Sequence, residues 1–97
     1  MITFEREHRT PHSETYTIFE DAGIVGRIDL HFTGTDVFGT LCTTADADND
    51  RIRMLVEAID ERLVMTADRY RDDLIINVWR GSPAGVFSDA DARNDEE

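Results

Sequence analysis

One stretch of the chain, residues 48–67, carries apolar side chains at the spacing of a single helix face. These side chains recur at intervals of three and four residues, at Ile52, Leu55, Val56, Ile59 and Leu63. Charged residues fall on the opposite side, and neither glycine nor proline interrupts the stretch. The pattern predicts a helix about 30 Å long at ~1.5 Å per residue, which is enough to cover one face of a small sheet.

Five other stretches alternate apolar and polar residues, the period of a β-strand. Four precede the helix, at 2–9, 14–20, 24–33 and 36–43, and the fifth follows it at 72–80. This order predicts a two-layer α+β domain, ββββαβ, with an antiparallel meander of four strands, one helix across one face, and a final strand. The final strand can pair parallel with the fourth strand or antiparallel with the first. We favour the first, because strand direction then alternates across the whole sheet.

Two predicted turns set the register of the meander. Residues 21–23 fit a type I turn followed by a glycine bulge, which places Glu20 opposite Ile24. Residues 34–35 fit a two-residue type II′ turn with Gly34 first. Both registers bring the inward apolar side chains of neighbouring strands opposite one another, which supports the pairing.

Gly26 and Gly39 fall on the inward side of these strands. A glycine inside a strand indicates either close approach of another element or a bulge. We favour close approach, with the helix packed low on the sheet at both positions.

The alternation assigns different side chains to the two faces of the sheet. The helix side takes Ile18, Ile28, Leu30, Leu41, Ile76 and Val78. The outer side takes five large apolar residues, Phe19, Val25, Phe38, Ile75 and Trp79. One helix covers one face, and a wet sheet face rarely holds so many large apolar groups, although singly scattered surface aromatics are the alternative. We predict that these five residues form an interface with a second copy or with another protein.

The charge balance narrows the choice of partners. The formal charge is -11, with 21 acidic residues against 10 basic ones, and every basic residue is arginine. This composition is typical of proteins in a salt-loaded cytoplasm, where salt screens self-repulsion, although a GC-rich genome also replaces lysine by arginine. Either interpretation disfavours binding to nucleic acid or to an anionic membrane, because both require positive charge.

The domain limits and the compartment follow from the same composition. We expect one domain over 1–87, with Val86 and Phe87 folded back onto the body, and a disordered acidic tail over 88–97. Cys42 is the sole cysteine, and the first residues show no signal-peptide pattern. The expected location is therefore the cytoplasm.

The acids before the helix resemble part of a calcium loop. Asp46, Asp48 and Asp50 alternate, and Glu57 occupies the twelfth position, but Arg51 stands where an EF-hand needs glycine. We interpret these acids as the helix entry, with Asp48 or the next residue as N-cap, and we expect no metal and no cofactor.

Catalytic chemistry has few candidates in this chain. The three histidines lack metal-ligand spacing, and we expect His31 to be a solvated or stacked side chain on the outer face, opposite Phe38. The predicted register places Arg27, but no general base, beside Cys42. We therefore predict a small acidic, non-enzymatic interaction module that forms a homodimer through its outer sheet face. The alternatives are an inhibitor or antitoxin-like protein that masks a basic partner, and a small enzyme that uses His31 or Cys42.

Overall fold

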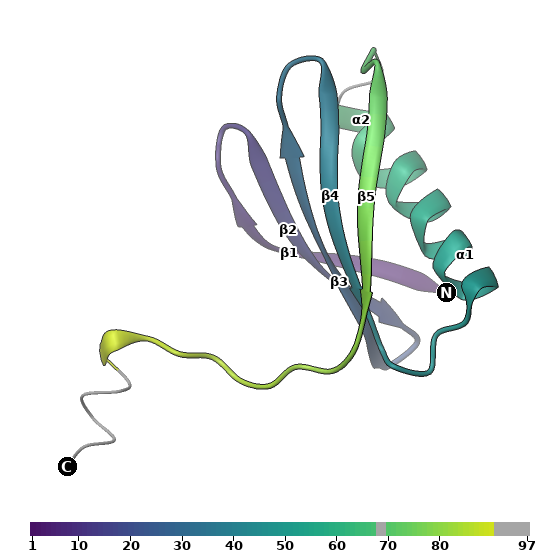
Figure 1. The fold of residues 1–97 in the computed structure, drawn as a ribbon, viewed down its shortest axis with the longest axis vertical. Helices are drawn as coiled ribbons and strands as arrows, with labels where there is room; N and C mark the ends of the chain where they lie inside the picture. Colours follow the sequence, from purple (N-terminus) through teal and green to yellow (C-terminus); the bar gives the residue numbers. More distant parts are fainter. Residues whose placement is uncertain (68–69, 91–97) are drawn as a thin grey trace.

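The structure is a computed structural model that describes residues 1–67 and 70–90. Its strands are β1 (Ile2–Arg9), β2 (Ser13–Glu20), β3 (Gly23–Phe32), β4 (Asp36–Thr43) and β5 (Asp73–Arg80). Its helical segment runs through α1 (Asn49–Ile59), the π-helical turn η1 (Asp60–Val64) and α2 (Met65–Ala67). The helical segment packs on one face of a five-stranded mixed sheet (Figure 1). The predicted α+β class is confirmed.

The position of β5 corrects the sequence-based prediction. The strand order is β1-β2-β3-β4-β5, and β5 lies parallel to β4, not antiparallel beside β1. The physical reason is the helical segment, which carries the chain back along β4 so that Asp73 pairs with Asp36 at the start of that strand. A crossover through a helix is the usual connection between parallel strands.

The turn between β2 and β3 is tighter than predicted. Glu20 pairs with Gly23, not with Ile24, so only Asp21 and Ala22 form the turn. Asp21 adopts a positive φ of 56°, a conformation that aspartate tolerates better than most residues. The predicted three-residue turn with a glycine bulge is therefore wrong.

The extra residue of this hairpin is Val25, which forms a bulge inside β3. Ile18 pairs with Gly26 as predicted, whereas the next residue, Phe19, pairs with Ile24. The bulge reverses the faces of the two residues before Gly26. Val25 packs against the core, and Ile24 is 59% exposed, so the predicted outward position of Val25 and inward position of Ile24 are both wrong.

The turn between β3 and β4 matches its prediction. Gly34 has a φ of +99°, a conformation that favours glycine, and the Thr33 backbone N–H donates to the Asp36 carbonyl at 3.1 Å. The strand pairs that follow have the predicted register, including Phe32 with Val37.

The two inward glycines are explained by neighbouring strands and not by the helix. A Cβ on Gly26 would lie 2.6 Å from the backbone oxygen of Cys42 on β4. A Cβ on Gly39 would lie 3.3 Å from the Ile76 side chain on β5. The favoured prediction, that the helix packs low on the sheet at both glycines, is therefore wrong. The alternative prediction was a bulge, and a bulge does directly precede Gly26.

The helical segment begins as predicted. The Asp48 side chain accepts a hydrogen bond from the Arg51 backbone N–H at 2.8 Å, which caps the first turn. The π-helical turn then adds a residue to the helix repeat. As a result Val64 is fully buried, whereas Leu63, the predicted inward residue, is half-buried. The buried core consists of Ile18, Ile28, Leu30, Val37, Leu41, Leu55, Ile59 and Val64.

The chain leaves the body after β5. The Gly81 N–H donates to the Thr43 carbonyl at 2.9 Å, and the following segment projects away from the sheet (Figure 1). Val86 is 89% exposed and Phe87 is 93% exposed, so the prediction that they fold back onto the body is wrong. Most of the predicted disordered tail, 91–97, lies outside the described residues. Within 1–67 and 70–90, no helix has the length and apolar character needed to cross a membrane.

Candidate functional site

The face of the sheet opposite the helix carries large exposed apolar side chains on its last two strands. This β4–β5 patch consists of Phe38, Cys42, Ile75 and Trp79. Phe38 pairs with Ile75, and Cys42 pairs with Trp79, so the four side chains form two cross-strand pairs on the same face, separated by the polar pair of Thr40 and Asn77. Trp79 is 66% exposed, Phe38 41% and Ile75 39%. The structure therefore places three of the five predicted interface residues together.

The other two predicted interface residues lie elsewhere. Phe19 is on the outer face but two strands away from β4, where it pairs with Thr3 and Ile24 and is partly buried. Val25 is turned by the bulge toward the helix and lines a hollow beside Leu55. Ile24 takes its outward place. The sequence pattern does not predict that Val25 and Ile24 exchange faces, because the alternation of β3 fits a strand without a bulge equally well.

Apart from Phe19 and Ile24, the outer face of β1 to β3 carries polar side chains, several of which bond to one another. The Arg27 guanidinium lies 3.5 Å from the Asp29 carboxylate, and the Thr15 hydroxyl donates to Asp29 at 2.8 Å. The Thr17 hydroxyl donates to Glu7 at 3.2 Å. The largest exposed apolar side chains of this face are therefore concentrated on β4 and β5, with Phe19 and Ile24 apart from them on β2 and β3. An apolar centre beside a polar rim is the usual anatomy of a protein interface.

His31 and Cys42, the residues of the enzyme alternative, are not brought together. His31 pairs with Ser13 and Phe38, whereas Cys42 pairs with Arg27 and Trp79. Cys42 stands four residues along β4 from the partner of His31, a separation of about 13 Å at ~3.3 Å per residue. That distance exceeds hydrogen-bond reach, so the two side chains do not form a nucleophile and base pair.

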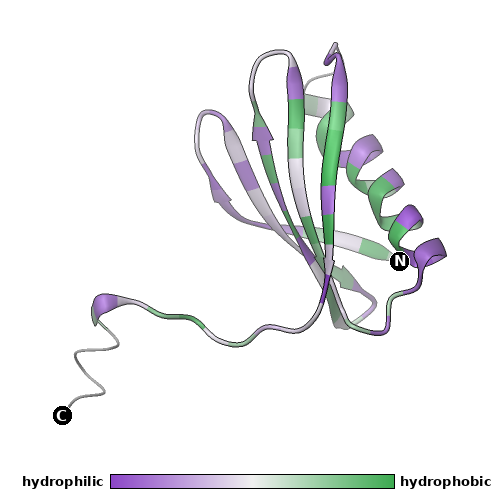
Figure 2. Ribbon diagram, viewed as in Figure 1, coloured by the Kyte–Doolittle hydropathy of each residue, from purple (hydrophilic) through white to green (hydrophobic). Residues whose placement is uncertain are grey.

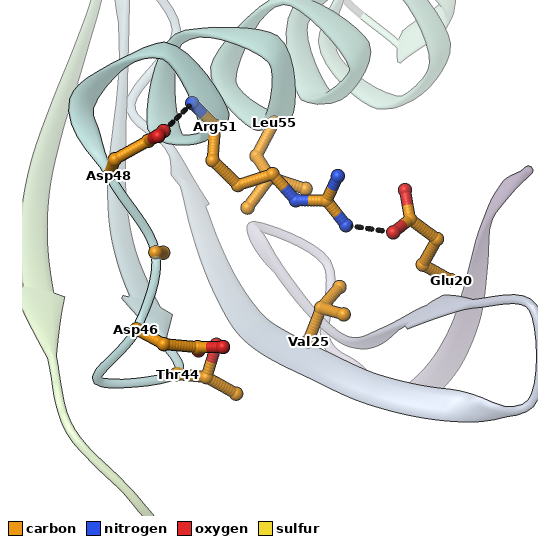
Figure 3. Close-up of a pocket in the computed structure, with 8 residues that line it drawn as sticks. Glu20, Val25, Thr44, Asp46, Asp48, Arg51 and Leu55 are labelled. Atoms are coloured by element: carbon orange, nitrogen blue, oxygen red, sulfur yellow. Dashed lines mark hydrogen bonds and ion pairs between the residues drawn. The ribbon is translucent and has the colours of Figure 1, made fainter.

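A hollow of about 380 Å³ lies on the other side of the molecule, between the start of α1 and the β2–β3 hairpin (Figure 3). Arg51 forms an ion pair with Glu20 across its mouth. Val25 and Leu55 supply apolar walls, and Asp48 at one side is already engaged as the helix cap. This ion pair joins the helix to the end of β2.

The polar groups of the hollow are occupied by one another. The hydrogen bond to Glu20 raises the pKa of Arg51 above its usual value, although partial burial opposes this shift. A hydrogen bond from Thr44 lowers the pKa of Asp46, and its own backbone contributes in the same direction. The lining contains neither histidine nor cysteine. These contacts explain how the helix is anchored to the sheet, and they supply neither an activated nucleophile nor a general base.

Asp46, Asp48 and Asp50, which resemble part of a calcium loop, were predicted to form the helix entry, and two of them lie at the helix start. Asp48 is the N-cap, and Asp50 lies 3.6 Å from Arg53 in the first turn. Among the described residues, no group of three histidine, cysteine, aspartate or glutamate side chains has the arrangement needed to hold a metal ion.

Comparison of the chain with protein-family models, with curated proteins and with solved structures finds no match to any of them. The β4–β5 patch and its setting are therefore the basis for a functional hypothesis.

Proposed function

We propose that this chain is a small non-enzymatic protein-interaction module that self-associates through the outer face of its sheet. The observation that carries the proposal is the β4–β5 patch, in which Phe38, Ile75 and Trp79 are exposed on the same face of two neighbouring strands. The helical segment covers only the opposite face (Figure 1). Aromatic side chains are enriched at interface centres, where they combine large contact area with few rotatable bonds.

The outer face has a suitable size for such an interface. Five strands ~4.8 Å apart, each of about eight residues at ~3.3 Å, give a face of roughly 600 Å² before side-chain relief is counted. A stable interface buries about 800 Å² per partner. Packing one face on a second copy therefore uses most of the available surface, with the β4–β5 patch at one side of the contact.

The apolar contacts of the patch alone support only a weak, concentration-dependent association. Full burial of a large apolar side chain is worth about 1.5–3 kcal/mol, and Phe38, Ile75 and Trp79 are already partly buried. About 1 kcal/mol for each of the six side chains in a symmetric pair gives about 6 kcal/mol. This sum lies in the lower part of the ~4–15 kcal/mol range for lost translational and rotational freedom.

Charge also affects this association. Each copy carries a formal charge of -11, so two copies repel each other in dilute salt. The β4–β5 patch itself contains no charged residue, and Arg27 and Asp29 beside it neutralise each other. Added KCl screens the long-range repulsion and leaves the apolar contact intact. Association should therefore strengthen as KCl is raised.

Sedimentation equilibrium over a range of protein concentrations in concentrated KCl tests the proposal. Phe38→Ser should weaken self-association, because Phe38 lies in the patch on β4. Met54→Ser is the matched control: it removes a similarly exposed apolar side chain from the helix, away from the outer face. The proposal fails if the wild-type chain stays monomeric at the highest concentration, or if Phe38→Ser associates as strongly as Met54→Ser.

A further inference from the structure

The two edges of the sheet differ in how they are protected against adding another strand. β1 carries charged or histidine side chains at every position from residue 5 to residue 9. Its pairing with β2 is broken by a bulge between Arg6 and His8. In addition, Arg62 donates to the backbone carbonyl of Ile2 at 2.6 Å. Charge, a bulge and cover from another element are the common means by which proteins block edge-to-edge association.

β5 has none of these features along its centre. Residues 74–79 are uncharged, contain no proline and pair with β4 in an unbroken register. Figure 2 shows apolar colouring along much of the middle of this strand. A long, regular, apolar edge strand is a site at which further strand pairing is expected.

The backbone of β5 has hydrogen-bonding groups directed to this edge. In a parallel ladder, the backbone groups of alternate residues point toward the same neighbouring strand. The Gly81 N–H donates to Thr43 on β4, so the odd-numbered residues of β5 face β4. The N–H and C=O groups of Ile76 and Val78 therefore point away from β4. Within the described ranges no other strand lies on that side. The Val78 side chain was predicted to lie under the helix, but it is 39% exposed because the helix does not cover the edge.

We propose that the β5 edge pairs antiparallel with β5 of a second copy, so that the two sheets become one. Pairing centred on Asn77 places Ile75 opposite the partner's Trp79 on the outer face. On the helix side it places Ile76 opposite the partner's Val78. Apolar side chains therefore meet apolar side chains on both faces, and the two Asn77 amides can hydrogen-bond at the centre.

The charges at the ends of β5 favour antiparallel over parallel pairing. The strand begins with Asp73 and ends with Arg80, and these are its two charged residues. Antiparallel pairing puts the acidic end of each strand beside the basic end of the other. Parallel pairing would put like charges together, which destabilises a strand pair. The pairing is also symmetric about a two-fold axis, the arrangement that closes without forming filaments.

Edge pairing is a second interface, beyond the face contact proposed above, and the two are compatible. Joining the β5 edges also places the two β4–β5 patches next to each other on one surface. The two-fold axis of the edge contact is perpendicular to the sheet, whereas that of a face contact lies in its plane. Two perpendicular two-fold axes generate a closed assembly of four copies.

Native-state hydrogen exchange and sedimentation equilibrium together test the edge pairing. Ile76 and Val78 amides should exchange slowly at high protein concentration and become faster on dilution, because their protection comes from the second copy. Val78→Pro removes the outward N–H without removing a β4–β5 hydrogen bond, and it should halve the assembly mass. Val78→Ala is the matched control, because it shortens the side chain but keeps the N–H.

The outcomes separate this inference from the proposed function. Edge pairing is overturned if both amides exchange at unprotected rates at every concentration, or if Val78→Pro and Val78→Ala give the same mass. If Val78→Pro fails to fold by circular dichroism, Val78→Lys, which places a charge at the edge, replaces it. Edge pairing stands and the face contact fails if the amides are protected but Phe38→Ser leaves the mass unchanged.

Discussion

Gly26→Ala should destabilise the fold, because the added methyl group has no space between two paired strands. Its Cβ would lie 2.6 Å from the Cys42 backbone oxygen, and Thr43 Cα is 3.5 Å away. A backbone oxygen cannot rotate aside, so β3 and β4 must separate locally. Overpacking of this kind costs about 1–3 kcal/mol, while the lower entropy of unfolded alanine offsets about 0.4–1 kcal/mol. We expect a net loss of about 1–2 kcal/mol from these two terms.

Urea unfolding followed by circular dichroism in concentrated KCl measures this loss, and thermal unfolding should show a fall of about 4–8 °C per kcal/mol. Gly81→Ala is the control, because a Cβ at Gly81 meets no atom within 4 Å. Gly39→Ala should give an intermediate result, since its closest neighbours are two side chains, Ile76 and Leu30, both at 3.3 Å, and not a backbone atom at 2.6 Å. Equal midpoints for Gly26→Ala and Gly81→Ala would refute the close-approach reasoning.

Three further predictions concern the helix cap, a tyrosine and salt. Asp48→Ala should lower stability by about 1 kcal/mol through loss of the N-cap, whereas Asp46→Ala should have little effect; equal urea midpoints would contradict this. Burial, followed by the hydrogen bond to Glu14, raises the pKa of Tyr16 above its usual 10.0. Stability should therefore fall as the pH rises above 10.0, because the unfolded chain releases the proton first, and Tyr16→Phe should reduce that fall; an unchanged pH profile would count against it. The urea midpoint should be higher in about 2 M than in about 0.1 M KCl, since salt screens self-repulsion; coincident midpoints would refute the salt-loaded interpretation.

Local patterns predicted much of the meander. The glycine turn at Gly34 was sufficient to place Phe32 opposite Val37. Ile18 was placed opposite Gly26 from a three-residue turn that is wrong, and the pairing holds because the bulge at Val25 compensates for the shorter turn. The correctly predicted features depend on the periodicity of the side chains and on turn-forming residues, and both can be identified in short stretches of sequence. The helix start was predictable for the same reason, because Asp48 is a strong N-cap residue.

Single-residue insertions were not predictable from the same patterns. The bulge at Val25 exchanges the faces of Val25 and Ile24, and the π-helical turn moves the buried position from Leu63 to Val64. In each case both neighbouring residues are apolar, so the sequence pattern fits either choice. Packing against the completed core decides between them.

The position of β5 in the sheet was also not predictable from local sequence patterns. The strand itself was correctly found, and Ile75 and Trp79 fall on the predicted face. Its neighbour depends on how the helical segment returns the chain, which is a tertiary property. The exposed apolar patch consequently differs from the predicted interface. It is concentrated on β4 and β5, whereas Phe19 lies apart from it and Val25 is turned inward.

The fluorescence of Trp79 tests the central claim most directly, because this tryptophan is the single one in the chain and lies in the β4–β5 patch. The measurement is a dilution series of emission spectra in concentrated KCl, carried out on Val78→Pro so that edge pairing does not contribute. Association through the outer face predicts emission at short wavelength at high concentration and a shift to longer wavelength on dilution. Emission typical of a water-exposed tryptophan at every concentration would contradict the account.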